Sequence, residues 1–518
     1  MLENRSFDHL LGSVPILGTD ARTGQPTQTD GKPAVPPPAR FSLDFDPGHE
    51  FCDVLAQLCG SGAVYPAGGP YPPIDNSGFG ASAAARPGAD PEADAAAVLT
   101  AFSADQLPVL NALAREFVVC DRWFSSLPGP TWPNRLFVHA ATSGGLDGSP
   151  TALQSSEALI EGYHFANGTI FDRLEQAGRP WSIVEGDALP QSLSLAGMVG
   201  HVIAGRYSNL EEFLAKVASP AFADAYTFIE PHYGHVLADG RNFKCGNSQH
   251  PLDDVTRGEA LLKRVYEAIR SSPHWDQSLL VVLYDEHGGF YDHVAPPPAI
   301  PPGDTPIAGL NRHGFAFDRL GVRVPAVIVS PLIERNLVDH TIYDHVAPPP
   351  AVPPGDTPIA GLNRHGFAFD RLGVRVPAVI VSPLIERNLV DHTVYDHSSV
   401  PATLERLFAL PPLTARDAAA NSFERLLTRA RPRDDAPVEL PLPADSGIPD
   451  CEDLDAGIVA GDLETAPSRL AGPIEPALAG FLHVAIARQM QLAISLDRNL
   501  DAAMAREAPG CARISAGS

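Results

Sequence analysis

The sequence carries a tandem repeat of 52 residues, and this repeat limits what the chain can fold into. Residues 291–342 recur as 343–394, with isoleucine replaced by valine at two positions, 300/352 and 342/394. Two copies are too few for a solenoid, which needs at least about three units to bury a core. One position in a sheet cannot hold both copies of the apolar segment VPAVIVSPL. We therefore expect one copy to dock and the other to add an edge strand or to pack loosely outside, and the sequence does not say which copy docks.

Apolar segments along the chain alternate between helix and strand patterns. The segments SLLVVLYDEHGG (278–289) and VPAVIVSPL (324–332) contain continuous apolar runs, which suit a parallel sheet covered on both faces. Apolar residues at helical spacing mark 257–272, and 104–124 has the pattern of a helix followed by a short buried strand. This alternation predicts an α/β sandwich with a mainly parallel sheet.

The length of the chain limits its domain organisation, and its net charge limits the kinds of partner it can bind. We expect one large domain over residues 1–430 and a helical extension over 431–518, because 518 residues suffice for a large domain with a smaller appendage or for two domains. Residues 18–40 and 60–98 are rich in Pro, Gly, Ala and Ser, which predicts long surface loops. The net charge of -25 argues against a nucleic-acid partner, but a bound cation can still attract an anionic substrate. No run of 18 apolar residues occurs, so no transmembrane helix is expected.

The six cysteines predict no disulfide scaffold, because their density is low and none forms a CxxC motif. Cys52 and Cys59 are candidates for a pair in an oxidising compartment. We expect most of the cysteines to be buried thiols.

The motif DEHGG places Asp285 and Glu286 at the end of a predicted buried strand. Ligands of open parallel sheets bind beyond the carboxyl ends of the strands. Two adjacent carboxylates there repel each other unless a cation neutralises them, and a divalent metal with oxygen ligands is the natural partner. Gly288 and Gly289 permit a close backbone approach. The alternative is a solvated acidic turn.

Two further motifs offer oxygen ligands. In LENRSFDH, Glu3 and Asn4 present a carboxylate and an amide side by side, although a polar chain start is by itself more often disordered. In GPTWPNRLF, Pro133 suits the first turn of a helix, which places Thr131 at a helix N-terminus that favours anions. The Thr131 hydroxyl is either an N-cap or a nucleophile activated by a metal. Arg135 either faces a phosphate or braces the loop.

Three histidines stand in loop motifs: His49 in DPGHEF, His232 in IEPHYG and His250 in SQHPLDD. Each of them is, taken singly, more often structural than catalytic.

Several motifs occur in an order that resembles a known family: MLENRSFDHLLG, GPTWPNRLF, FIEPHYG, QHPLDD, YDEHGGFYDHV, GVRVPAVIVSP and YDHSSV. Over roughly residues 1–410 the chain resembles the phosphoesterase family of bacterial phospholipases C, plant non-specific phospholipases C and acid phosphatases. The resemblance implies an alkaline-phosphatase-like fold, a three-layer α/β/α sandwich. It also implies a single divalent metal ion, whose identity stays open.

The resemblance assigns roles to the residues that match the family motifs. It implies that the metal is bound by Glu3, Asn4, Asp285, Glu286 and Thr131, with Thr131 also acting as the nucleophile. His49 and His250 are expected to hold phosphate oxygens or to shuttle a proton, and Arg135 and His232 to contact the substrate. The family motif that closes the core is expected at 396–399, because only this copy of Tyr-Asp-His continues into Ser-Ser.

The resemblance implies a phospholipase C-like hydrolase that acts on phosphatidylcholine or a similar diester. A phosphomonoesterase of the acid phosphatase type is the alternative, since both activities can share such a centre. Peripheral contact with a membrane is a further expectation, with the loops at 18–40 and 60–98 as candidates for a lid or a lipid-facing rim.

Two departures from the family pattern raise a different possibility. The family's Glu-Asn pair follows a buried strand that would end at Met1, and no signal peptide opens the sequence. The start therefore has the pattern of a truncated chain, which leaves the compartment open although the family is often secreted or periplasmic. The truncation and the repeat also predict a rival outcome, an inactive family member. A serine esterase is disfavoured because no G-x-S-x-G motif is present.

Overall fold

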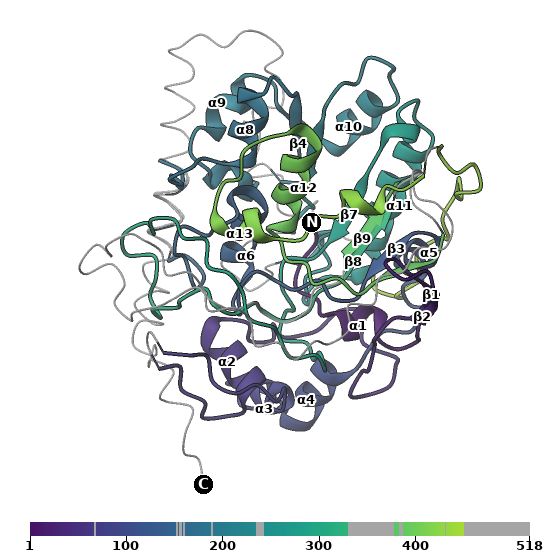
Figure 1. Ribbon diagram of the computed structural model, residues 1–518. Coiled ribbons are helices and arrows are strands. Elements are labelled where there is room, and N and C mark those ends of the chain that lie inside the picture. The colour runs from purple at the N-terminus through teal and green to yellow at the C-terminus, as the bar shows by residue number, and fades with distance from the viewer. Residues whose placement is uncertain are drawn as a thin grey trace, which may run out of the picture.

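The computed structural model shows a mixed α/β fold in which helices pack around two sheets (Figure 1). It describes residues 1–66, 69–151, 154, 158, 161–187, 190–234, 243–329, 378–382, 387–429 and 431–449. Most of the predicted extension over 431–518 lies outside the described residues.

A seven-stranded sheet forms the centre of the fold. Its strands follow the order β2 (Pro26–Gln28), β1 (Leu17–Asp20), β10 (Leu389–Asp391), β3 (Val118–Cys120), β8 (Ala326–Val329), β7 (Leu280–Leu283) and β9 (Ala378–Val381). A second sheet is parallel throughout, in the order β5 (Tyr207–Asn209), β4 (Trp181–Glu185) and β6 (Tyr226–Ile229).

The central sheet is mixed rather than parallel throughout. β1, β10 and β3 pair in parallel, but β8 runs antiparallel to both β3 and β7. The prediction of a parallel strand at 324–332 was therefore wrong in direction. The reason is that the segment between β7 and β8 contains no helix in the structure, and without a helical crossover the returning strand lies antiparallel to the one before it.

Helices pack around these two sheets. Those of the described residues are α1 (Phe7–Leu11), α2 (Phe51–Cys59), α3 (Phe79–Ala84), α4 (Pro91–Leu99), α5 (Pro108–Glu116), α6 (Thr131–Ala140), α8 (Ile170–Gln176), α9 (Met198–Ile203), α10 (Leu210–Val217), α11 (Val255–Arg270), α12 (Ser399–Phe408) and α13 (Ala415–Ala419), with short 3₁₀ turns at Gln191–Ser194, Trp275–Gln277 and Glu424–Leu426. Helix α5 packs on β3 and β8, and α11 packs on α5. The helix-then-strand prediction for 104–124 and the helix prediction for 257–272 are confirmed.

The two segments predicted as long loops contain short regular elements. β1 and β2 lie in or beside 18–40, and α3 and α4 lie within 60–98. Helix α4 begins where the side chain of Asp90 accepts a hydrogen bond from the Ala93 amide, with Pro91 in the first turn. An aspartate cap followed by proline is a helix start signal that the high alanine and glycine content of the segment obscured.

The two repeat copies offer equivalent strands to the same neighbour. In antiparallel pairing with β7, Leu280 lies opposite Val329 of β8 and opposite Val381 of β9, and β8 and β9 also pair in parallel (Figure 1). β9 is last in the strand order but also pairs with β8 and contacts β3, so it is not a plain edge strand added beyond β7. The first copy contributes the buried Asp292 and Arg323, whereas β10 comes from the second copy.

We predict that deleting residues 343–394 leaves the fold and the site intact. Residue 342 is then joined to 395, and the retained 337–339 repeats the sequence Leu-Val-Asp of β10. Circular dichroism and calorimetry should show one cooperative transition with a midpoint no lower than that of the full chain. Deleting 291–342 instead leaves the same chain apart from two valines, so it is the matched control. A deletion variant that does not fold would show that both copies are required.

The state of the cysteines differs from the expected pairing. Cys59 and Cys120 are free, whereas Cys52 and Cys245 are disulfide-bonded, so the proposed pair of Cys52 with Cys59 was wrong. None of the described helices combines the length and apolar character that crossing a membrane requires.

Candidate functional site

Backbone pairing brings the start of the chain to the end of β7. The Leu2 amide donates to the Leu283 carbonyl at 2.8 Å, and the Asp285 amide donates back to Leu2 at 3.2 Å. One residue further, the Arg5 amide donates to the Glu286 carbonyl at 2.9 Å. The ENR and DEHGG motifs therefore lie side by side, as Figure 1 shows from the position of the N-terminus next to β7.

Asn4 occupies a strained backbone position at this junction. Its φ is +56°, which non-glycine residues rarely adopt, and its amide donates to Asp285 Oδ1 at 2.9 Å. Gly288 makes the junction possible, because a Cβ at this position would lie 2.2 Å from the Asn4 carbonyl oxygen. The strain is concentrated where the proposed ligands meet, as is common at functional sites.

Thr131 is the first residue of α6 and faces this junction. Its hydroxyl donates to Asn4 Oδ1 at 3.3 Å. The side chain of Asn134 fixes the preceding turn by donating to the Gly129 and Pro130 carbonyls at 3.0 Å each. Thr131 makes no side-chain cap, so its hydroxyl is directed to the Asn4 side chain rather than to its own helix.

The carboxylates at the junction are buried and partly without hydrogen-bond partners. Glu3 is 3% exposed and Glu286 is fully buried, and Glu3 Oε2 and Glu286 Oε1 have no hydrogen-bond partner. Burial, opposed by Arg135 and reinforced by Asp285, raises the pKa of Glu3 to about 8. Burial also holds the pKa of Glu286 well above its ordinary value. Buried carboxylate oxygens without partners are unfavourable unless a cation binds them, so this donor set fits a hard divalent metal.

Arg135 contacts the carboxylates rather than open space. Its Nε donates to Asp285 Oδ2 at 3.1 Å, its Nη2 lies 3.5 Å from Glu3 Oε1, and its Nη1 donates to the Tyr233 hydroxyl at 2.8 Å. The Tyr233 hydroxyl in turn donates to Glu230 Oε2 at 2.8 Å. These contacts support the bracing alternative for Arg135 over a direct role in substrate binding.

The two predicted catalytic histidines share an acidic neighbour. His49 Nδ1 donates to the Pro47 carbonyl at 2.8 Å and lies 4.0 Å from Asp46 Oδ1, while His250 Nε2 lies 3.7 Å from the same oxygen. Burial alone would lower the pKa of His49, but surrounding carboxylates, with Glu286 first among them, raise it to about 10. Burial lowers the pKa of His250 to about 4. The surrounding carboxylates thus favour the charged form of His49, whereas burial favours the neutral form of His250.

His232 has a more open position than these two histidines. Its Nε2 lies 3.2 Å from Asp187 Oδ1, and its Nδ1 accepts from the Gly234 amide at 3.2 Å. The side chain is 37% exposed. The predicted contact of His232 with substrate stays a prediction.

Several supporting residues were not singled out from the sequence. His287 Nε2 bonds to Gln57 Oε1 at 2.7 Å, and Gln57 donates to the Gly48 carbonyl at 2.6 Å, which links the DEHGG motif to the His49 loop. His397 Nε2 donates to the Asp285 carbonyl at 2.6 Å, and Nδ1 accepts from the Trp123 indole. His287 lies within DEHGG and His397 within the expected 396–399 motif, but the sequence did not indicate their partners Gln57 and Trp123, which lie 230 and 274 residues away.

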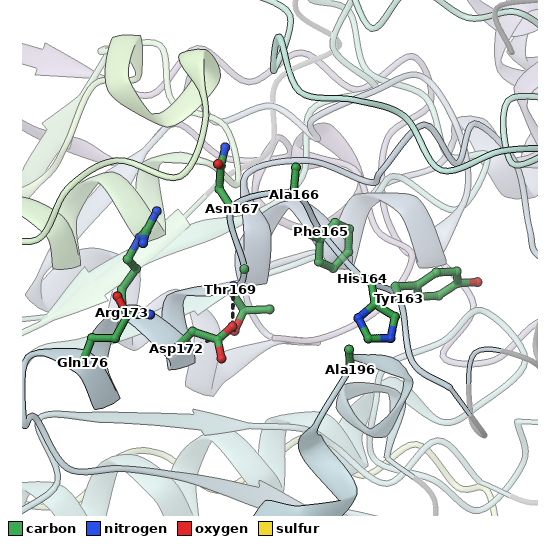
Figure 2. A pocket seen from close by; sticks show the side chains of 11 residues that line it. Tyr163, His164, Phe165, Ala166, Asn167, Thr169, Asp172, Arg173, Gln176 and Ala196 are labelled. Carbon is green, nitrogen blue, oxygen red and sulfur yellow. Dashed lines mark hydrogen bonds between the residues drawn. The ribbon is translucent and has the colours of Figure 1, made fainter. Parts of the chain in front are cut away.

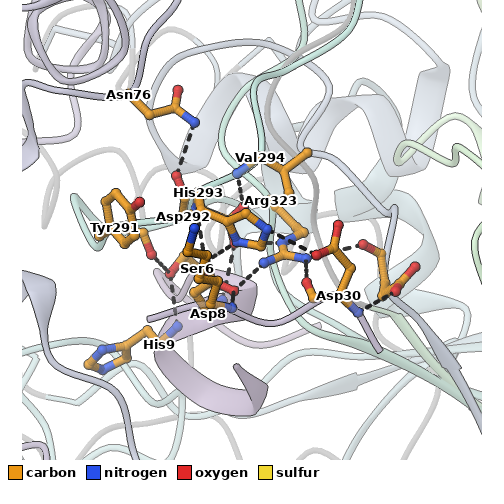
Figure 3. A network of polar contacts seen from close by, with 12 residues as sticks. Ser6, Asp8, His9, Asp30, Asn76, Tyr291, Asp292, His293, Val294 and Arg323 are labelled. Atoms are coloured by element: carbon orange, nitrogen blue, oxygen red, sulfur yellow. Dashed lines mark hydrogen bonds and ion pairs between the residues drawn. The ribbon is translucent and has the colours of Figure 1, made fainter. Parts of the chain in front are cut away.

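A second acidic cluster has the composition of a metal site. Ligand atoms of Asp8, Asp292 and His293 all lie within 4.8 Å of one another, and among the described residues no other such group meets this distance criterion. Arg323 lies between the two aspartates and pairs with both, and His293 Nε2 bonds to Asp30 Oδ1 at 3.0 Å (Figure 3). The guanidinium already supplies the positive charge, so we interpret this cluster as structural.

Arg323→Ala is expected to destabilise the protein by about 3–5 kcal/mol, because it leaves Asp8 and Asp292 buried without their cation. Urea unfolding measures the change. Arg264→Ala is the control, since Arg264 forms an exposed pair with Glu211 and should have little effect. If added Mn²⁺ or Ca²⁺ replaced the lost arginine and restored stability, the cluster would be a metal site after all.

A cavity of about 450 Å³ lies away from these motifs. It is lined by the segment Tyr163–Thr169, by residues of α8 and by Ala196 (Figure 2). Asp172 in its wall is engaged by Thr169, whose amide donates to Asp172 Oδ2 at 2.7 Å. None of the predicted site residues lines this cavity.

Comparisons with known proteins agree with the motif order. The model of the phosphoesterase family matches residues 1–347 and again 341–411, and the two matches meet within the repeat. Non-specific phospholipase C3 of Arabidopsis thaliana is 33% identical over 467 residues, covering 88% of this chain and 76% of the relative. Non-specific phospholipase C6 of the same plant is 34% identical over 450 residues (85% and 74%). Phospholipase C B of Mycobacterium tuberculosis (strain ATCC 25618 / H37Rv) is 26% identical over 489 residues (87% and 80%). The chain thus belongs to the phosphoesterase family and is a hydrolase that acts on phosphoester bonds.

Proposed function

We propose that the chain is a metal-dependent phospholipase C-like diesterase in which Thr131 attacks phosphorus. The observation that carries the proposal is the meeting of three distant segments: the Thr131 hydroxyl bonds to Asn4, and Asn4 bonds to Asp285 beside unpartnered oxygens of Glu3 and Glu286. Relatives named phospholipase C favour a diester over a phosphomonoester. Phosphatidylcholine or a similar phospholipid is the proposed substrate, reached by peripheral contact with its surface.

The chain's own residues would position the nucleophile and the phosphoryl group. Glu3, Asn4, Asp285, Glu286 and Thr131 would hold one divalent cation, which supplies positive charge that lowers the pKa of the hydroxyl and neutralises phosphoryl oxygens. Thr131 begins a ten-residue helix, whose free amides and dipole favour the phosphoryl anion. Arg135 would keep Asp285 and Glu3 in place.

The histidines would move the protons. With Thr131 Oγ1 deprotonated and its proton already lost to solvent, attack forms a bond to phosphorus and breaks the bond to the alcohol, which takes a proton from the His49 imidazolium. The neutral His49 then removes a proton from water, which attacks phosphorus and releases Thr131. Because Nδ1 of His49 is bound to the Pro47 carbonyl, Nε2 is the nitrogen for these transfers. His250 is buried and its Nε2 faces Asp46 Oδ1, so its predicted contact with a phosphate oxygen stays a prediction.

The proposal also covers the architecture, which is a three-layer sandwich, and the division of the chain into a catalytic domain and a C-terminal extension. The central sheet with its helices fits a three-layer α/β/α architecture of the alkaline-phosphatase type. A catalytic domain over residues 1–430 fits the family match, which ends at 411.

Hydrolysis assays with and without EDTA test this function. Phosphatidylcholine and p-nitrophenyl phosphorylcholine should be cleaved, p-nitrophenyl phosphate should be a poorer substrate, and EDTA should stop all turnover. Preference for the monoester would favour the acid phosphatase alternative. A folded protein that cleaves none of the three would be an inactive family member.

A further inference from the structure

One carboxylate oxygen lies between the two site histidines. Asp46 Oδ1 is 3.7 Å from His250 Nε2 and 4.0 Å from His49 Nδ1. The atom is buried and has no hydrogen-bond partner, although the Asp46 side chain as a whole is 37% exposed. The three residues come from two loops about 200 residues apart in sequence. A buried carboxylate oxygen without a hydrogen-bond partner is energetically unfavourable. The position of Asp46 Oδ1 between two imidazole rings therefore needs an explanation.

The hydrogen bonds of the two rings fix which nitrogens carry protons. The Leu252 amide donates to His250 Nδ1 at 3.3 Å, so the neutral His250 ring carries its proton on Nε2, which faces Asp46. The Pro47 carbonyl can only accept, so His49 carries a proton on Nδ1, also on the side of Asp46. The His250 N–H therefore faces Asp46 Oδ1 at 3.7 Å, whereas the His49 N–H is bonded to the Pro47 carbonyl at 2.8 Å and lies 4.0 Å from the same oxygen. Such contacts often tighten only when substrate is bound.

The surroundings hold this arrangement in place. The ring of Phe243 stacks on His250 with centroids 3.9 Å apart and an interplanar angle of 13°. Cys52 follows His49 and Cys245 precedes His250, and both cysteines are disulfide-bonded, so both loops are tethered. Arg5 donates to the His250 carbonyl at 3.2 Å, which ties the His250 loop to the ENR motif.

We propose that Asp46 is a positioning residue that orients His49 and His250 together through Oδ1, and so aims the proton donor at the leaving alcohol. The inference rests on the proposed function and deepens it. Asp46 itself touches neither the cation ligands nor the reacting atoms in this role. Its effect passes through His49, whose Nε2 is left for the substrate when Nδ1 is held by Pro47 and Asp46.

A proton donor matters most when the leaving group is a poor one. The diacylglycerol alkoxide is strongly basic and must be protonated, whereas p-nitrophenolate leaves without help. Asp46→Asn should therefore lower kcat on phosphatidylcholine by about 10²-fold and kcat on p-nitrophenyl phosphorylcholine by less than about tenfold, with little change in KM. Asp46→Glu should recover part of the loss on the lipid. A merely structural defect would reduce both substrates equally.

Asp44→Asn is the matched control. Asp44 lies two residues away in the same loop and forms an exposed pair with Arg40, so both activities should be unchanged. Metal content, measured by plasma mass spectrometry, should be the same in wild type, Asp46→Asn and Asp44→Asn. Equal losses on the two substrates, no loss on either, or loss of metal from Asp46→Asn would overturn the inference.

Histidine ¹⁵N chemical shifts provide a readout without turnover. In wild-type protein His250 should be the Nε2–H tautomer, and Asp46→Asn should shift the resonances of His49 and His250 while leaving the other histidines unchanged. Unchanged shifts would overturn the inference even if activity fell. If the wild type cleaved neither substrate but these shifts moved, the proposed function would fail and the positioning by Asp46 would stand.

Discussion

Thr131→Ala is expected to lower kcat by at least about 10³-fold on any phosphodiester, because removing a nucleophile leaves only binding and electrostatic effects. Metal content should stay close to that of wild type, since four other oxygen ligands remain. The position tolerates the change structurally, because the Thr131 side chain makes no cap for α6. Steady-state assays and metal analysis on the same protein sample measure both quantities.

Thr131→Ser is the matched control for this prediction. It keeps a hydroxyl at the same place and should retain a substantial part of the activity. Acid quenching of wild-type protein during turnover, followed by peptide mass spectrometry, should place a phosphoryl group on Thr131. Full activity in Thr131→Ala would contradict the covalent scheme and leave direct attack by water as the mechanism.

Glu286→Gln is expected to have opposite effects on stability and activity. Glu286 is fully buried and its Oε1 has no hydrogen-bond partner, so a neutral side chain of the same shape should raise the thermal midpoint of metal-free protein by a few degrees. The same change removes a metal ligand, so added Mn²⁺ or Ca²⁺ should no longer raise the midpoint and turnover should be lost.

Glu259→Gln is the control that shows whether the effects of Glu286→Gln arise merely from neutralising a buried carboxylate. Glu259 is also fully buried, but its two carboxylate oxygens accept from the Val109 and Leu110 amides at 2.7 and 2.9 Å at the start of α5. Its replacement should lower the midpoint and leave the response to metal unchanged. If Glu286→Gln lowered the metal-free midpoint as Glu259→Gln does, the buried carboxylate would be structural.

Local patterns in the sequence predicted the elements better than their arrangement. The helix α11, the strand β7 and the junction of α5 with β3 follow from apolar spacing alone. The direction of β8 did not, because the same apolar run fits a parallel or an antiparallel strand buried on both faces. α4 was missed although Asp90 and Pro91 form a recognisable helix start.

The meeting of the site residues could be predicted only from the order of the motifs. Asn4 contacts Asp285 across 281 residues and Thr131 across 127, and no periodicity encodes such contacts. Asp46 opens the DPGHEF motif, but its relation to His250 appears only once two distant loops are packed together. The repeat was evident in the sequence, yet the equal registers of β8 and β9 against β7 required the structure.

Diffraction from crystals soaked in Mn²⁺, measured with its anomalous signal, tests most directly whether one cation is held where the three segments meet. We expect a single strong peak enclosed by oxygens of Glu3, Asn4, Thr131, Asp285 and Glu286. A peak between Asp8, Asp292 and His293 instead, or no peak near Thr131, would contradict the proposed centre.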